Sequence, residues 1–156
     1  MITPSSRRPH MQELARIQID ASPEAVFDLL ADNTRRGEWA EGMETFDYTS
    51  DFDPDNPVGT TFTQRIREGG RITEYHGEIT TYDPPNAYGS QVTGGSYSMV
   101  VEYHLTPANG GTQVVNLCDV DSSSRFVRIM GFLFGWFTRY LGRKQLRKLK
   151  ELVEAA

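Results

Sequence analysis

The sequence predicts an α+β fold, in which a series of antiparallel strands is followed by one long helix. Between residues 44 and 121, apolar and polar residues alternate in short segments that are separated by turns rich in glycine and proline. From residue 122 to the C-terminus the chain contains no proline, and its apolar residues recur with helical spacing. At 156 residues the chain has the length of one ordinary domain, so we expect a single core.

The first segment after the N-terminus is expected to be a strand, followed by two short helices. In Gln12–Asp20, apolar residues alternate with polar ones, which is typical of a strand with one buried face. Ser22 is a good N-cap and Pro23 suits the first helical position, so a helix is expected to begin there. A second short helix around Arg35–Glu41 is expected to direct Trp39 inward.

Six strands are predicted after these helices. Because the turns between them are short, successive strands should pair antiparallel and form a meander. Their predicted bounds are Glu44 to Asp51, Thr60 to Arg67, Arg71 to Tyr82, Tyr88 to Val92, Ser96 to Thr106 and Thr112 to Asp121.

The composition excludes several classes of function. A net charge of −5 disfavours nucleic acid as a partner. The single cysteine, Cys118, cannot form an intramolecular disulfide, and residues 1–10 resemble a mobile arm rather than a signal peptide, so we expect a cytoplasmic protein. The longest apolar run, Ile129–Phe137, has about half the length of a membrane-spanning helix.

The long helix places small and large residues on opposite sides of its first half. On a helical wheel, the face with Leu146, Leu149 and Val153 continues backward as Gly131, Gly135, Thr138 and Gly142. The large residues Phe126, Met130, Leu133, Phe137 and Leu141 lie on the other side. Either the helix bends near Gly142, or its first half is enclosed on both sides with the small residues toward the sheet. The aromatic residues then belong to the core, line a cavity, or form an outward patch for a partner or a membrane surface.

Five stretches together resemble a known superfamily. They are "IQIDASPEAVFDLLADNTRRGEWAEGM", "VGTTFTQR", "GEITTYDPPNAYGSQV", "MVVEYHLTPANGGTQV" and the terminal helix. In their order the chain resembles the START-like helix-grip superfamily (SRPBCC), in its polyketide cyclase/dehydrase and lipid-transport branch. The resemblance implies that residues 11–156 form one domain with a helix-grip fold: a curved seven-stranded antiparallel sheet wrapped around the C-terminal helix, with a deep apolar cavity between them. The superfamily includes ligand carriers, hormone receptors, aromatase/cyclases and regulators of hydrolases, so the fold alone does not select a function.

The common catalytic and metal-binding motifs are missing from the sequence. His10, His76 and His104 are far apart, and no closely spaced pair of cysteine or histidine residues is present. There is no G-x-S-x-G motif, P-loop or G-x-G-x-x-G motif. We therefore expect no metal and no cofactor.

Strand alternation suggests which residues face the helix. In Arg71–Tyr82, the face with Tyr75 and Gly77 is less charged and is expected to point inward, where Gly77 would leave room for a ligand or for the helix. Tyr103 lies on the apolar face of its strand, which leaves His104 on the solvated face. Arg65 is expected either to pair with Glu74 and Glu78 on the outside or to orient an anionic oxygen on the inside.

Three functions fit these patterns. The first is binding of a hydrophobic small molecule, a lipid or a polyketide-like compound, by residues expected to line the cavity: Trp39, Phe62, Tyr75, Gly77, Tyr103, Met130, Gly135 and Phe137. The second is a cyclase or dehydrase in the same cavity, for which Tyr75, Arg65 and Tyr103 are the candidate catalytic residues. The third is a protein-interaction module that uses the aromatic half of the helix.

A basic run lies in the same helix. Its residues are Arg139, Arg143, Lys144, Arg147, Lys148 and Lys150. The run is explained either by the negative end of the helix dipole and a solvated face, or by transient contact with an anionic lipid headgroup or membrane surface. Both a monomer and a homodimer are compatible with the sequence.

Overall fold

The computed structural model describes residues 11–94, 97–122 and 125–156, and the side chains of all these residues except 97, 122 and 125–134. The predicted N-terminal arm, residues 1–10, lies outside this range. The elements are β1 (Gln12–Ile19), α1 (Pro23–Ala31), the 3-10 helix η1 (Asn33–Glu38), β2 (Met43–Tyr48), β3 (Thr61–Glu68), β4 (Arg71–Asp83), β5 (Ala87–Gly94), β6 (Tyr97–Ala108), β7 (Gly111–Ser122) and α2 (Arg125–Glu154).

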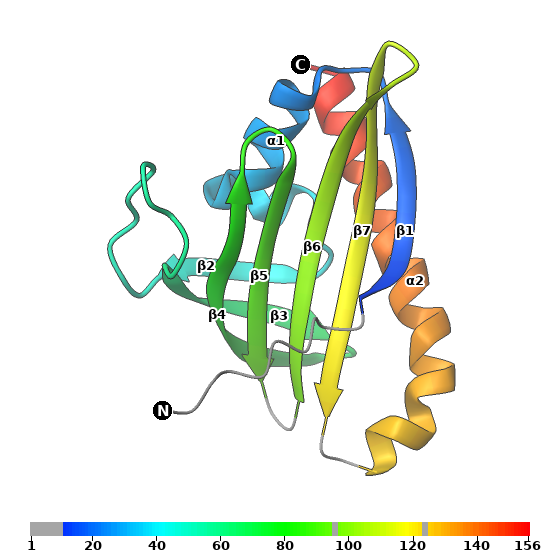
Figure 1. The fold of residues 1–156 in the computed structure, drawn as a ribbon. Coiled ribbons are helices and arrows are strands. Elements are labelled where there is room, and N and C mark those ends of the chain that lie inside the picture. The colour runs from blue at the N-terminus through cyan, green and yellow to red at the C-terminus, as the bar shows by residue number, and fades with distance from the viewer. Residues whose placement is uncertain (1–10, 95–96, 123–124) are drawn as a thin grey trace, which may run out of the picture.

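The strands form one antiparallel sheet of seven strands in the order β1-β7-β6-β5-β4-β3-β2. The sheet is strongly curved, so that β2 and β3 run across the lower end of the other strands (Figure 1). Both α1 and α2 lie on the same side of the sheet, behind it in Figure 1. We call the side of the sheet that faces α1 and α2 its inner face. The structure confirms the predicted helix-grip architecture.

The predicted strands agree closely with those in the structure. The largest difference is at the end of β2, which stops at Tyr48 rather than Asp51. Residues 49–56 form an exposed loop, and neither Pro54 nor the buried Pro57 can donate a backbone hydrogen bond to a neighbouring strand. Ser22 caps α1 as predicted, because its hydroxyl accepts a hydrogen bond from the backbone N–H of Ala25 at 3.2 Å.

The second short helix differs from the prediction in type and position. It is a 3-10 helix over residues 33–38, in which the N–H of Trp39 donates to the carbonyl of Arg36 at 3.2 Å. Asp32 begins it by accepting a hydrogen bond from the N–H of Thr34. In a 3-10 helix residues three apart lie on the same side, so this turn directs Arg36 and Trp39 the same way. Trp39 is fully buried, as expected.

Helix α2 continues without interruption through Gly142. A Cβ atom at Gly142 would lie 3.4 Å from the Cβ atom of Leu14 and 3.5 Å from that of Ala15, so the helix contacts β1 closely there. Leu146, Leu149 and Val153 are buried on the same face of the helix. Gly142 therefore faces the sheet on the same side of the helix as these buried residues. Within the described parts of the chain, no helix is both long and apolar enough to cross a membrane.

Candidate functional site

A buried arginine surrounded by aromatic rings is the most unusual polar feature of the inner face. Arg36 of η1 is only 7% exposed. Its guanidinium carbon lies 5.4 Å from the ring centre of Trp39, 5.8 Å from that of Phe46 and 5.2 Å from that of Tyr88. These distances are typical of cation–π contacts, which are strongest where water is excluded.

The charge of Arg36 has no acidic partner within the protein. Its Nη2 atom donates to the carbonyl of Leu30 at 3.2 Å, whereas its buried Nε atom has no hydrogen-bond partner in the part of the chain that the structure describes. Among the described residues, no carboxylate lies within ion-pair distance, and the undescribed residues include no Asp or Glu. A buried guanidinium is costly unless an opposite charge or hydrogen bonds compensate it, so this site favours an anionic or strongly polar ligand.

Two further buried polar atoms, one on Trp39 and one on Asn116, have no hydrogen-bond partner among the described residues. The indole Nε1 of Trp39 is buried without a hydrogen bond, and so is the Oδ1 atom of Asn116. The Trp39 ring meets the Tyr103 ring edge to face, with centres 5.9 Å apart, and Tyr103 is the direct neighbour of Asn116 in the sheet. Since buried polar atoms in folded proteins nearly always have a partner, we expect water or a ligand beside Trp39, Tyr103 and Asn116.

Tyr103 adds a neutral hydroxyl group beside Trp39 and Asn116. Burial raises the pKa of Tyr103 to about 12, although the charge of Arg36 opposes this rise. The hydroxyl therefore remains protonated at neutral pH and is able to donate a hydrogen bond. Within the described part of the chain no hydrogen bond of this hydroxyl is formed.

A small hydrogen-bond network fixes the ring of Tyr88, one of the three that lie against Arg36. The Tyr88 hydroxyl donates to Oδ1 of Asn33 at 3.3 Å, and Nδ2 of Asn33 donates to the Tyr48 hydroxyl at 2.6 Å. Burial raises the pKa of Tyr48 above its ordinary value. These three side chains connect η1 to β2 and β5, and so hold Arg36 and Tyr88 in position relative to one another.

Tyr75 and Gly77 face inward, as predicted, but neither leaves open space. The Tyr75 hydroxyl donates to Oε1 of Glu68 at 2.8 Å. A Cβ atom at Gly77 would lie 2.2 Å from the ring of Phe62, its partner on β3. The prediction that Gly77 leaves room for a ligand is therefore wrong, because the Phe62 ring occupies that room.

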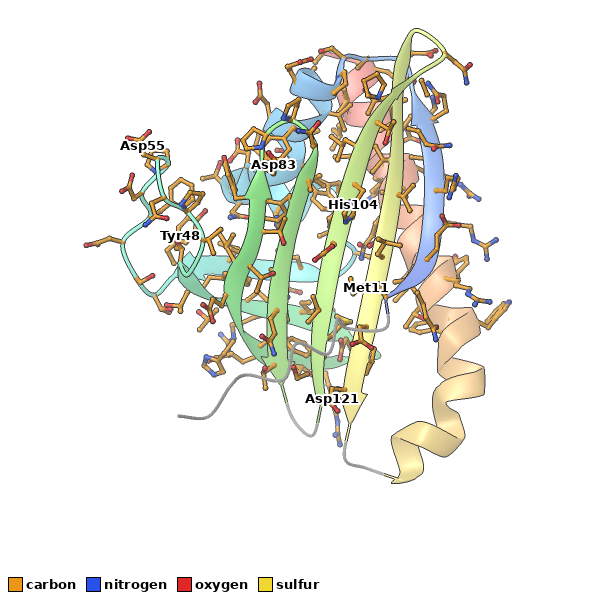
Figure 2. The ribbon with its side chains drawn as sticks, in the orientation of Figure 1. Met11, Tyr48, Asp55, Asp83, His104 and Asp121 are labelled. Atoms are coloured by element: carbon orange, nitrogen blue, oxygen red, sulfur yellow. The ribbon has the colours of Figure 1, made fainter. Side chains whose placement is uncertain are left out.

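Arg65 and His104 lie on the outer face of the sheet. Arg65 is more than half exposed, with its Nε atom 3.9 Å from Oε2 of Glu74, so the alternative in which Arg65 orients a ligand on the inside is wrong. His104, labelled in Figure 2, is exposed on β6, and its Nε2 atom lies 2.8 Å from Oε2 of Glu102. The sequence placed His104 correctly on the solvated face.

The three residues of α2 that were expected to line the cavity differ in their surroundings. Apart from its own helix and chain neighbours, a Cβ atom at Gly135 would meet no atom of the described residues within 4 Å. Phe137 is 49% exposed, which favours the outward-patch interpretation of this residue. Met130 lies in the part of α2 whose side chains are not described.

A separate groove lies between α1 and the end of α2. It is lined by Ala25, Asp28, Leu29, Asp32, Arg35, Leu152, Val153 and Ala156. None of the residues predicted from the sequence as a site lies in it, and its carboxylates would disfavour an anion.

Sequence reasoning missed Arg36 and Asn116. Arginine is rarely buried, so composition argues against choosing Arg36 from the sequence. One signal was available, because Arg36 lies three residues before Trp39 in a segment expected to direct that tryptophan inward. Asn116 shares the inward pattern of Val114 and Cys118 on β7, which made it a polar residue at a core position.

Comparison with solved structures confirms the architecture. The protein TTHA0849 from Thermus thermophilus is similar with a TM-score of 0.76 and 18% identity, over 93% of this chain and 97% of that one. The ZhuI aromatase/cyclase from Streptomyces sp. R1128 is similar with a TM-score of 0.73 and 14% identity, over 93% and 94% of the two chains. The di-domain aromatase/cyclase StfQ of the steffimycin biosynthetic pathway matches with a TM-score of 0.74 and 11% identity, over 93% of this chain and 51% of that one.

Comparison at the level of sequence gives the family. No curated protein matches the chain significantly. The model of the family described as polyketide cyclase / dehydrase and lipid transport matches residues 14–154, which include every described strand and helix apart from the first residues of β1. The chain therefore belongs to the polyketide cyclase/dehydrase and lipid-transport family.

Proposed function

We propose that this protein binds a hydrophobic small molecule, a lipid or a polyketide-like compound, between the inner face of the sheet and α2, with an acidic oxygen of that molecule against Arg36. The observation that supports this most is the buried guanidinium of Arg36, which lacks a carboxylate partner. An anionic oxygen, such as that of a carboxylate or an enolate, would supply the missing charge and accept a hydrogen bond from Nε.

The neighbouring side chains support a ligand that is otherwise apolar or aromatic. Trp39 and Tyr103 offer ring surface together with one N–H and one O–H donor, and Asn116 offers an acceptor. A few polar groups that converge among apolar residues are typical of small-molecule sites, where they fix the orientation of the ligand. Both activities in the family description, polyketide cyclisation and lipid transport, concern molecules of this kind.

A cyclase or dehydrase is the second candidate function. Its support is the pairing of a cationic Arg36 with the neutral hydroxyl of Tyr103, because two donors of this kind can stabilise an enolate oxygen as negative charge develops on it. Tyr103→Phe should then lower kcat far more than it raises KM for a poly-β-ketone substrate. Equal effects on binding and turnover would leave Tyr103 as a binding residue.

The first experiment is native mass spectrometry of the purified protein beside its denatured mass, with organic extraction of any bound compound. Binding is then measured for two pairs of probes, oleate against oleyl alcohol and 1-hydroxy-2-naphthoate against 1-naphthol. We expect the acid of at least one pair to bind at least about tenfold tighter than its neutral partner, because the acid alone compensates Arg36. Arg36→Gln should remove that difference, and Arg65→Gln, on the outer face, should retain it.

Two results would overturn the proposal. One is that none of the four probes binds and the protein is purified empty. The other is that a folded Arg36→Gln variant still prefers the acid to the same extent.

The position of the ligand is tested by Gly135→Trp. The added indole would enter the open space beside Gly135 and should abolish binding of the probes while circular dichroism stays unchanged. Lys148→Trp, at an exposed position on the same helix, is the matched control. Unchanged affinity in a folded Gly135→Trp variant would place the ligand elsewhere.

A further inference from the structure

The charge of this acidic protein is distributed very unevenly along the chain. Residues 125–150 contain eight Lys and Arg residues and no Asp or Glu. Because the whole chain has a net charge of −5, the remaining residues have a net charge of −13. Most of α2 is therefore a cationic element in an anionic protein. The helix dipole stabilises cations only in the last turn, so it does not explain the basic residues nearer the middle of α2.

Large aromatic side chains are exposed on the same helix. Trp136 is 70% exposed, Phe137 49% and Tyr140 48%. The rings of Trp136 and Tyr140 stack with their centres 6.3 Å apart. An exposed indole beside two other exposed rings is unusual for the surface of a globular protein and indicates a contact surface.

The aromatic and basic residues share one side of α2. Trp136, Tyr140, Arg143 and Arg147 recur at intervals of four, three and four residues, and all four are exposed. Arg139 is exposed beside them. We call Trp136, Phe137, Arg139, Tyr140, Arg143 and Arg147 the outer face of α2. Gly142, Leu146 and Leu149, on the other side of the helix, are buried.

We propose that the outer face of α2 binds the surface of a membrane that contains anionic lipids. Tryptophan and tyrosine prefer the boundary between headgroups and acyl chains, since each has an apolar ring and one polar group. Arginine forms two parallel hydrogen bonds with a lipid phosphate, and a basic cluster is attracted by the negative surface potential of such a membrane. The combination of three exposed rings with neighbouring arginines fits the boundary of an anionic bilayer, where both kinds of side chain are stabilised. This surface is independent of the ligand proposed above.

Vesicle sedimentation tests the proposal directly. The full chain is mixed with vesicles of phosphatidylcholine and phosphatidylglycerol in a ratio of about three to one, and with vesicles of phosphatidylcholine alone. We expect sedimentation with the mixed vesicles, at least about tenfold weaker with the neutral ones, and a decrease as salt is added. Each of the double variants Trp136→Ala/Tyr140→Ala and Arg143→Gln/Arg147→Gln should weaken binding at least about tenfold.

A control uses one exposed cation and one exposed apolar residue outside α2. The double variant Arg71→Gln/Ile72→Ala changes one exposed cation and one exposed apolar residue on β4, and should bind the mixed vesicles like the unmodified chain. Fluorescence adds a local measurement, because Trp39 is buried and Trp136 is the exposed one of the two tryptophans. Its emission should shift to shorter wavelength when the mixed vesicles are added.

Either of two results would overturn the proposal. The first is that the unmodified chain does not sediment with the mixed vesicles, even if it binds a soluble polyglutamate, which would indicate an acidic protein partner instead. The second is that both α2 double variants remain folded and sediment as well as the control.

Discussion

The ring of Phe62 fills the position that a side chain at Gly77 would occupy. The two residues are partners on β3 and β4, and a Cβ atom at Gly77 would lie 2.2 Å from Cζ of Phe62. Phe62 is itself fully buried and stacks on Phe46, with ring centres 4.6 Å apart, so it has little room to move. Gly94 has the same relationship with the Tyr75 ring, at 2.4 Å.

Gly77→Ala should therefore destabilise the protein. The added methyl group would displace a buried aromatic ring in a packed core, which costs about 1 to 3 kcal/mol. Urea unfolding followed by circular dichroism measures the change. A variant with the same midpoint and slope as the unmodified protein would show that the Phe62 ring moves aside freely.

Gly135→Ala should have the opposite effect. Apart from its own helix and chain neighbours, the methyl group would meet no atom of the described residues within 4 Å. Alanine is also more favourable than glycine in a helix by about 1 kcal/mol. We expect the free energy of unfolding to rise by up to about 1 kcal/mol, because the space beside Gly135 can accept the group. A loss of stability at this position would mean that the helix needs a glycine there for close packing.

Arg36→Met should separate stability from binding. Methionine has similar length and no charge. Replacing even a buried ion pair by well-packed apolar residues is often neutral or stabilising by about 1 to 4 kcal/mol, so removal of this buried charge, which has no ion-pair partner, should not lower the free energy of unfolding. The same variant should lose its preference for acidic probes. If Arg36→Met instead unfolds the protein, then the bond to the carbonyl of Leu30 and the three ring contacts outweigh the cost of the buried charge.

Cys118 should be unreactive in the folded protein. Burial raises the pKa of its thiol to about 12, and the adjacent Asp119 acts in the same direction. At pH 8 the thiolate that attacks a disulfide reagent is then nearly absent, so we expect modification only at the rate of unfolding. Ellman's reagent in the presence and absence of urea measures this. Rapid modification without urea would contradict the buried position of the side chain.

The same thiol makes stability depend on alkaline pH. In the unfolded chain Cys118 ionises near its ordinary pKa, whereas the folded protein keeps the proton up to about pH 12. Between these values the unfolded state binds fewer protons, so this residue lowers the free energy of unfolding by about 1.4 kcal/mol for each pH unit gained. The stability that it contributes is fully present below the ordinary pKa. Cys118→Ala should reduce the alkaline decline measured by urea unfolding.

Backbone patterns in this sequence predicted the fold well, and the site less well. Alternation identified the inward face of β4, with Tyr75 and Gly77, and the outward position of His104, because period-two patterning follows directly from strand geometry. It could not show that the Phe62 ring covers Gly77, since that depends on the conformation of one side chain on another strand. Arg36 was missed for a related reason. Its burial results from rings next to η1 and on β2 and β5, which come together only in the folded protein.

The position of β1 in the sheet has a consequence for synthesis of the chain. Gln12 pairs with Cys118 and Ile19 with Thr112, so β1 has its neighbour in the sheet near the other end of the sequence. At elongation rates of about 5 to 20 residues per second, β1 leaves the ribosome roughly 5 to 20 seconds before β7 is complete. During that interval Ala15, Ile17 and Ile19 present an apolar strand face without its native partner. Contacts between such distant residues also slow folding of the complete chain. A nascent chain that ends before β7 therefore exposes an unpaired apolar strand face, which a chaperone would protect from aggregation.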